Sequence, residues 1–126
     1  MSLFALAMRM ARTPPGRALT RFLFSKMTFA LPVARLRETP NLLAFKHPHP
    51  AYAFHVLIVP KKAVASLVEL DASDAAFLAD LFSTVQSLVQ EYQLPAYRLI
   101  VNGGEYQDFP QMHFHLVYDV RAQRDE

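Results

Sequence analysis

The segment that decides the fold, residues 97–119, reads YRLIVNGGEYQDFPQMHFHLVYD. Its two ends, residues 97–102 and 113–119, are short apolar runs typical of strands. Between them stand Gly103 and Gly104, two of only three glycines in the chain. Such a pair fits either a turn that needs positive φ or a loop whose backbone amides face an anion. The segment therefore predicts two strands connected through a loop.

Two further strands are predicted upstream. Residues 41–46 (NLLAFK) form the first, and Pro48 and Pro50 end it because proline donates no ladder hydrogen bond. Residues 54–59 (FHVLIV) form the second, which ends at Pro60. A hairpin that connects these two strands is the expected topology.

Residues 72–92 carry the helical pattern of the chain. Apolar side chains recur there at spacings of three and four, at Phe77, Leu78, Leu81, Phe82, Val85, Leu88, Val89 and Tyr92. We expect Asp71 to cap this helix, and Pro95 follows its end. Strands, then one long helix, then strands predict an α+β domain with an antiparallel sheet covered by helix on one face.

Composition limits the class of protein. The chain has 126 residues, of which 52% are hydrophobic and 19% charged, as expected for one globular domain. It contains no cysteine, which excludes disulfides, thiolate metal ligands and cysteine nucleophiles. No uninterrupted apolar run reaches about 18 residues, so no membrane span is expected.

Charge is distributed unevenly along the chain. Residues 1–37 hold seven basic and no acidic side chains, whereas residues 38–126 hold six basic and eleven acidic ones. The acidic part repels phosphate backbones, so we expect no nucleic-acid partner.

We divide the chain into a basic N-terminal extension (1–35), a domain (36–120) and a polar tail (121–126). The extension is acid-free and arginine-rich, as organellar transit peptides are. A mis-assigned translation start and an ordinary extension that packs on the domain are the alternatives. We expect a cytoplasmic protein, or an organellar one of mitochondrial type if the extension is a transit peptide.

Histidines are the candidate chemical groups. All five lie in the acidic part, at His47, His49, His55, His113 and His115. Because successive strand residues face opposite ways, Gln111, His113 and His115 are predicted to share one face, with the two imidazoles about 6.6 to 6.8 Å apart. The residues between and after them, Met112, Phe114, Leu116 and Tyr118, are predicted to face the core.

Two chemistries suit this pair, beside a purely structural role. With a third imidazole from His55, His47 or His49, it forms a three-nitrogen site that leaves zinc an open position for water. Alternatively, a neutral imidazole attacks phosphorus, which requires one free ring nitrogen and an acceptor for the other. In that case Gln111 and His115 are placed to donate hydrogen bonds to the phosphate.

The run QDFPQMHFHLV at residues 107–117 resembles the signature of the histidine triad family, with Gln111 in place of the first histidine. LAFKHPHPAYAFHVLIVPKK at 43–62 is similar to the family's strand, loop and strand that end in Val-Pro-Lys, and LIVNGG at 99–104 to the strand that delivers an asparagine. The resemblance covers residues 36–119. It implies an antiparallel sheet of about five strands, one long and one short helix, and a homodimer.

The resemblance also implies a function. It is that of a nucleotide-binding phosphohydrolase or nucleotidyl transferase, acting on the α-phosphate of nucleoside phosphate esters, phosphoramidates or dinucleoside polyphosphates. His113 would be the nucleophile that forms a nucleotidyl-histidine, His115 would bind phosphate oxygens, and Gln111 would hold the first triad position. The other implied nucleotide contacts are His55, Asn102, Gln107, Phe45 and His47. No cofactor is required, although a divalent cation can accompany a polyphosphate, and the expected partner is a purine nucleotide.

Two residues depart from the family pattern. Gln111 cannot be protonated, so any step that needs an acid at this position is expected to slow. His47 stands where nucleotide-binding members have an acidic residue that contacts the ribose, so a weaker preference for ribonucleotides is expected. A non-catalytic nucleotide-binding module is therefore the alternative function, and a histidine-ligated metal protein the second. Lys61 and Lys62 are interpreted as a solvated pair, and His49 is given no role.

Overall fold

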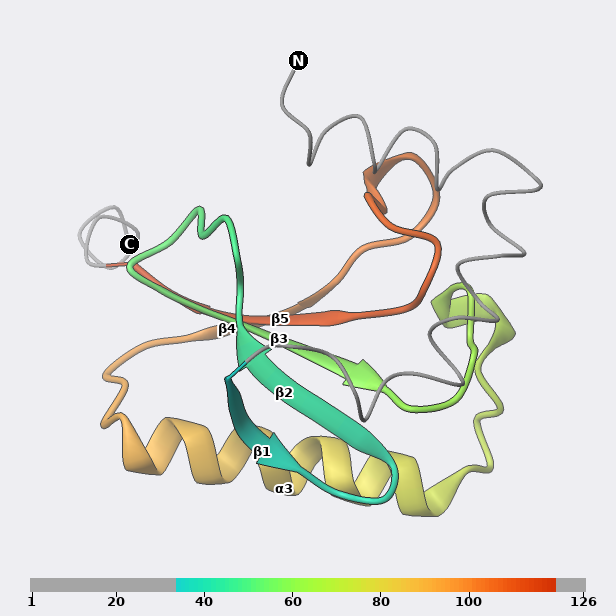
Figure 1. The fold of residues 1–126 in the computed structure, drawn as a ribbon, viewed down its shortest axis with the longest axis horizontal. Coiled ribbons are helices and arrows are strands. Elements are labelled where there is room, and N and C mark those ends of the chain that lie inside the picture. The colour runs from blue at the N-terminus through green and yellow to red at the C-terminus, as the bar shows by residue number, and fades with distance from the viewer. Residues whose placement is uncertain (1–33, 120–126) are drawn as a thin grey trace.

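The computed structural model describes residues 34–119. Within them lie five strands, one α-helix and two 3-10 turns, coloured along the chain in Figure 1. Their bounds are β1 Arg35–Glu38, β2 Leu42–Lys46, β3 Phe54–Pro60, η2 Leu67–Glu69, α3 Ala75–Glu91, β4 Arg98–Val101, η3 Gly104–Tyr106 and β5 Phe114–Tyr118. The strands form a single sheet in the order β1-β2-β3-β5-β4, and every neighbouring pair is antiparallel. The predicted α+β class and five-stranded antiparallel sheet are confirmed.

The predicted strands correspond to β2, β3, β4 and β5 within one or two residues at each end. The expected hairpin is the β2–β3 pair, in which Leu42 lies opposite Pro60 and Lys46 opposite Val56. The fifth strand, β1, is formed by RLRE, a sequence with one apolar side chain that we did not assign to a strand.

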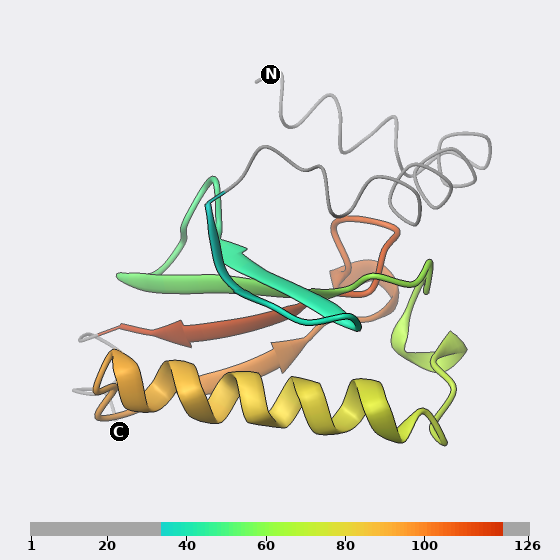
Figure 2. The same cartoon turned by 60° about the horizontal axis from the view of Figure 1, so that its bottom comes forward.

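Helix α3 lies along one face of the sheet, as Figures 1 and 2 both show. The main core fills the space between them, and its buried members are Leu42, Ala44, Val56, Ile58, Val64, Phe77, Leu81, Val85, Leu88, Met112, Phe114 and Leu116. The prediction that Met112, Phe114 and Leu116 face the core is therefore confirmed. Tyr118 is half-buried and does not belong to this cluster.

The helix begins three residues later than predicted. Asp74, not Asp71, is its N-cap, because the Asp74 carboxylate accepts the backbone N–H of Phe77 at 3.1 Å. Asp71 instead accepts the N–H and hydroxyl of Ser73, at 2.9 and 2.6 Å, in the turn before the helix. The expected cap residue thus organises the approach to the helix rather than its first turn.

No second α-helix occurs between residues 34 and 119, so the expected short helix is wrong for the described part of the chain. The two 3-10 turns, η2 and η3, stand in its place. Gly104 begins η3 with a φ of 58°, in the left-handed region that favours glycine. The turn interpretation therefore holds for Gly104, whereas Gly103 is extended.

Most of the predicted extension (1–35) and all of the predicted tail (121–126) lie outside the described residues. Within residues 34–119, no helix combines the length and apolarity that crossing a membrane requires.

Candidate active site

A cluster of imidazoles lies on the sheet face away from α3. The register of β3 with β5 makes His55 and His115 diagonal neighbours, and their ring centroids are 5.1 Å apart. The neighbours of His115 in β5, Phe114 and Leu116, belong to the core under the helix. Because strand residues alternate, His115 points to the opposite face.

Two more imidazoles join this pair from the ends of strands. His47 directly follows β2, and its backbone N–H donates to the carbonyl oxygen of His55 at 2.9 Å. The ring centroid of His47 lies 4.3 Å from that of His55 and 6.0 Å from that of His115. His113 directly precedes β5, and its ring centroid is 5.0 Å from that of His115. Four histidines thus lie together, whereas His49 is exposed.

Burial keeps three of these rings uncharged. Burial is the main reason that the pKa values of His55 and His115 are lowered to about 4. Repulsion between these rings and neighbouring imidazoles in their protonated forms contributes to the same shift. The pKa of His47 is lowered as well, first by burial and then by His113 and His49, while Asp108 opposes the shift. At neutral pH each of the three rings therefore has one N–H donor and one nitrogen lone pair.

Hydrogen bonds assign the proton of each of these neutral rings. The backbone N–H of Ala51 donates to Nδ1 of His55 at 3.1 Å, so the proton of His55 is on Nε2. This Nε2–H donates to Nδ1 of His115 at 2.8 Å, which places the proton of His115 on its Nε2. The backbone N–H of His49 donates to Nδ1 of His47 at 2.9 Å, so His47 also carries its proton on Nε2.

The chain of hydrogen bonds from Ala51 through His55 to His115 ends in a donor for a ligand. Nε2 of His115 is buried and has no hydrogen-bond partner in the part of the chain that the structure describes. A buried donor without an acceptor is unfavourable, so this position favours a ligand oxygen.

His113 has the opposite arrangement. Its Nδ1 lies 2.8 Å from the backbone carbonyl oxygen of Gln111, which can only accept, so the Nδ1 carries the proton. In the neutral ring the lone pair is then on Nε2. Of the four clustered imidazoles, His113 is the one whose lone pair no described hydrogen bond uses.

Gln111 does not lie where we expected it. Its side chain is fully buried, and it bonds to the loop after β3 instead of sharing a strand face with His113 and His115. The physical reason is that β5 begins only at Phe114, so the alternation rule does not extend back to Gln111. The rings of His113 and His115 are correspondingly closer than the predicted strand spacing.

A group of three histidines meets the distance requirement for a metal site. Ring nitrogens of His47, His55 and His115 all lie within 4.8 Å of one another, a set that differs from the predicted one by lacking His113. However, the lone pair of each ring already accepts a hydrogen bond, from a backbone N–H or from another imidazole. Since a metal ligand must offer a lone pair, a metal could bind these rings only by breaking those bonds.

The structure also places the other predicted nucleotide contacts. Phe45 lies opposite Leu57, and Leu57 lies opposite His115, so the three form a row across the sheet. Phe45 is 7% exposed and packs in a small apolar cluster on this face. Asn102 directly follows β4, whose last residue, Val101, pairs with Phe114, so Asn102 is the next residue toward His113.

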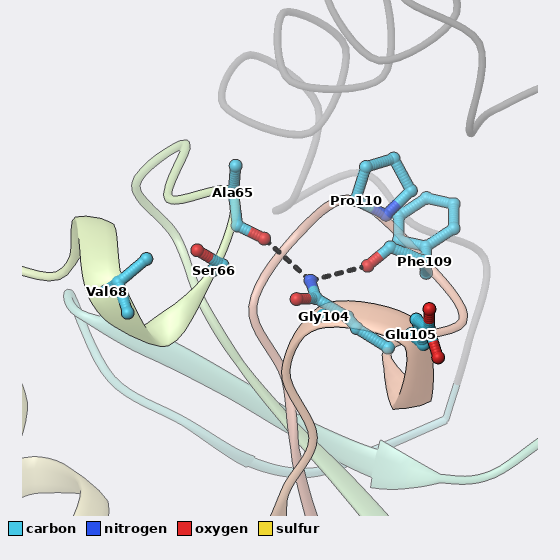
Figure 3. Close-up of a pocket in the computed structure, with 8 residues that line it drawn as sticks. Ala65, Ser66, Val68, Gly104, Glu105, Phe109 and Pro110 are labelled. Atoms are coloured by element: carbon cyan, nitrogen blue, oxygen red, sulfur yellow. Dashed lines mark hydrogen bonds between the residues drawn. The ribbon is translucent and has the colours of Figure 1, made fainter.

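Gln107 connects two loops at a cleft. Its Nε2 donates to the carbonyl oxygens of Ala65 and Phe109, at 2.6 and 2.8 Å, the bonds drawn as dashed lines in Figure 3. The cleft has a volume of about 410 Å³ and is lined by Ala65, Ser66, Val68, Gly104, Glu105, Gln107, Phe109 and Pro110. None of the four clustered histidines lines it, so this cleft is distinct from the imidazole surface.

Sequence reasoning missed the backbone groups that assign the protons. The Ala51 N–H reaches His55 because the loop after His47 turns back on itself, and Pro48 and Pro50 signal that turn. Nothing in the sequence indicated which ring nitrogen each amide would meet.

Taken together, the site and the fold define an α+β protein with a histidine cluster on the face of a five-stranded antiparallel sheet that is opposite to α3. The family model described as the HIT domain matches residues 30–120. The chain belongs to this family, as the histidine triad resemblance predicted.

Individual relatives agree with this assignment. An uncharacterized HIT-like protein of Synechococcus elongatus is 32% identical over 90 residues, which cover 69% of this chain and 79% of that protein. A structure described as a HIT family hydrolase from Clostridium thermocellum superposes with a TM-score of 0.68 at 31% identity, covering 78% of this chain and 90% of that one. A histidine triad nucleotide-binding protein from Candida albicans gives a TM-score of 0.64 at 28% identity, covering 75% and 71%.

Proposed function

We propose that the protein binds a nucleotide and transfers its nucleotidyl group, to water or to another acceptor, through a covalent intermediate on His113. The observation that carries this proposal is the proton arrangement of the cluster. His113 alone among the four imidazoles keeps an uncommitted lone pair, held on Nε2 by the hydrogen bond from its Nδ1 to Gln111. A nucleophilic imidazole needs this arrangement.

The proposed reaction has two displacements at the α-phosphorus. In the first, Nε2 of His113 forms a bond to phosphorus, and the bond from phosphorus to the leaving group breaks. In the second, a water or other acceptor forms a new bond to phosphorus, and the bond to His113 breaks. In hydrolysis the water supplies a hydroxyl to phosphorus and a proton that balances the one taken up by the leaving group.

His115 is proposed to stabilise charge on the phosphate. Its Nε2–H is buried without a described partner beside the His113 ring, so it is available to a non-bridging phosphate oxygen. His55 supports this role because its own Nε2–H holds Nδ1 of His115 as an acceptor. A preoriented donor in a dry site is worth more than the same donor in water.

These donors are weak acids, which restricts the substrate. Because the pKa of His115 is about 4, its ring is neutral at pH 7. The neutral ring donates a hydrogen bond through its N–H, but it does not readily transfer this proton to a leaving group. We therefore propose substrates whose leaving group departs as a stable anion or brings its own proton. Phosphate leaving groups of dinucleoside polyphosphates fit the first case, and a divalent cation could accompany them. A phosphoramidate fits the second case when its nitrogen takes a proton from solvent before the amine leaves. No other cofactor is proposed.

The proposed nucleotide is a purine nucleotide, as the family resemblance implies. Its base would contact the apolar cluster around Phe45, and its ribose would contact His47. Asn102 and Gln107 are proposed to contact the nucleotide near its phosphates, as the family resemblance implies.

The proposal is tested by His113→Ala with a purine nucleoside phosphoramidate and a dinucleoside polyphosphate as substrates. We expect turnover to fall by several orders of magnitude, because removal of a covalent nucleophile cannot be compensated by binding alone. Nucleotide affinity should change little. Turnover that persists in the variant contradicts the proposal, and affinity without turnover in the wild-type protein indicates a binding module instead.

The family resemblance also leads us to propose a homodimer, in a cytoplasmic or organellar compartment. Strand β4 is at one edge of the sheet, so within the described residues it has a strand partner on one side alone, and such an edge can pair with a second copy. Light scattering on the full chain, which should give twice the 14.3 kDa chain mass, tests the assembly.

A further inference from the structure

We propose that Gln111 is a positioning residue whose buried amide sets the tautomer of His113. In this view its side chain fixes the segment Pro60–Val64, the end of β3 and the loop after it, against the peptide group that accepts the His113 Nδ1–H. The inference rests on the proposed role of His113 as nucleophile, but its geometry can be tested separately.

The side chain of Gln111 is fully buried and makes three hydrogen bonds, to the last residue of β3 and to the loop that follows it. Its Oε1 accepts the backbone N–H of Val64 at 3.1 Å. Its Nε2 donates to the carbonyl oxygens of Pro60 and Lys62, at 3.3 and 2.7 Å. The carboxamide oxygen and both donated hydrogen bonds of the carboxamide nitrogen are therefore directed to residues 60–64.

The same loop fixes the peptide group between Gln111 and Met112. The backbone N–H of Met112 donates to the carbonyl oxygen of Val64 at 2.7 Å, so Val64 is bonded on both its N–H and its C=O. No described peptide bond is cis. In a trans peptide the N–H and C=O point in opposite directions, so an N–H directed at Val64 directs the Gln111 carbonyl away from it.

That carbonyl oxygen is the acceptor of the His113 Nδ1–H, at 2.8 Å. A rotation of the peptide plane would remove the acceptor and release the preference for the Nδ1–H tautomer. The Nε2–H tautomer has no lone pair toward phosphorus, so it is not nucleophilic at that atom. Gln111 thus acts through His113 and carries no proton itself.

The hydrogen-bond pattern requires a glutamine. It needs one acceptor and two donors at the end of the side chain. A neutral imidazole offers one of each, and a carboxylate offers no donor to the two carbonyl oxygens. Gln111→His can therefore make at most two of the three bonds, and Gln111→Glu places an anion against two carbonyl groups.

The test combines nitrogen-15 NMR of histidine-labelled protein, above neutral pH, with steady-state kinetics. In the wild-type protein we expect His113 to be protonated at Nδ1, and His55 and His115 at Nε2. In Gln111→Glu we expect a mixed tautomer for His113, with kcat reduced by roughly 10²-fold and KM changed far less, because a small misplacement of the attacking atom has this effect. Gln107→Glu is the matched control for the tautomer measurement alone, because Gln107 has a proposed nucleotide contact. It loses two amide-to-carbonyl bonds in the preceding loop, and the His113 tautomer should stay unchanged.

The inference is overturned if wild-type His113 is protonated at Nε2, or if folded Gln111→Glu keeps a pure Nδ1–H tautomer. If Gln111→Glu does not fold, Gln111→His replaces it, with the same expected tautomer mixture. A kcat above the wild-type value in Gln111→His would also overturn the inference. It would show that the wild-type rate is limited by the lack of a proton donor at position 111. A wild-type protein without turnover defeats the proposed function, whereas the tautomer measurements still decide the role of Gln111.

Discussion

His47 presents a hydrogen-bond donor at the position where the family resemblance implies an acidic residue, which would present an acceptor. Its Nδ1 is occupied by the His49 backbone N–H, so Nε2–H is the group that remains for a ligand. We expect His47→Asp to increase the preference for a ribonucleotide over its 2′-deoxy analogue by about 10-fold or more, the effect of one hydrogen bond to a charged group. The ratio of the two kcat/KM values measures this preference.

The matched comparison is His47→Asn, which offers an acceptor of the same length without the charge and should give a smaller gain. An unchanged ratio in His47→Asp would show that the ribose does not lie against position 47. It would leave the role of His113 untouched.

At the residue scale, the sequence predicted the histidines better than their protons. Strand alternation correctly separated His115 from Phe114 and Leu116, because those residues lie in β5. It failed for Gln111, which lies before the strand and turns into the protein. The tautomers depend on which backbone amide each ring meets, such as that of Ala51, and residue spacing carries no information about that contact.

Among the secondary-structure elements, the N-cap of helix α3 can be tested by substitution. Asp74 caps the helix and also accepts Lys62 Nζ at 3.0 Å, whereas Asp71 bonds only within its own turn and to Ser73 in the described contacts. We expect Asp74→Ala to lower the free energy of unfolding by about 1 kcal/mol, the usual effect of losing an N-cap. Asp71→Ala should cost less. Urea denaturation of both variants measures the difference, and equal losses would contradict the assignment of the cap.

The periodic part of the helix was predictable, but its first residue was not. Phe77, Leu81, Val85 and Leu88 recur at helical spacing and are buried against the sheet. Asp71 and Asp74 are both acceptable caps by composition, and only the contact with the Phe77 N–H distinguishes them. Strand β1 escaped prediction because its place depends on pairing with β2 and on the bonds of Arg37 to Ser87 and Glu91 of α3.

For the whole molecule, the buried imidazoles make stability depend on pH. His55 and His115 have pKa values of about 4 in the folded protein and an ordinary value of 6.5 in the unfolded chain. Between these values the unfolded state binds more protons, so the free energy of unfolding rises with pH. We expect stability to fall as the pH decreases through 6.5 toward about 4, and the slope contributed by these two groups to vanish well above 6.5, where neither state binds the protons.

Denaturant unfolding at several pH values between 6.5 and 4.5 measures this slope above the range in which the carboxyl groups with lowered pKa, such as Asp74 and Asp80, titrate. A His55→Gln, His115→Gln double variant should have a flatter profile than the wild-type protein. An equal slope in both proteins would mean that other groups set the pH dependence.

The central claim, that His113 becomes covalently nucleotidylated, is tested most directly by intact-protein mass spectrometry. The protein is mixed with an adenosine phosphoramidate or a diadenosine polyphosphate and quenched rapidly in alkaline denaturant, because a phosphorus–histidine bond is labile in acid. His49→Ala is the matched control, since that exposed histidine has no proposed role. We predict an added adenylyl group in the wild-type protein and in His49→Ala, and none in His113→Ala. Product formation without any adduct at early reaction times, or an adduct that persists in His113→Ala, would contradict the account.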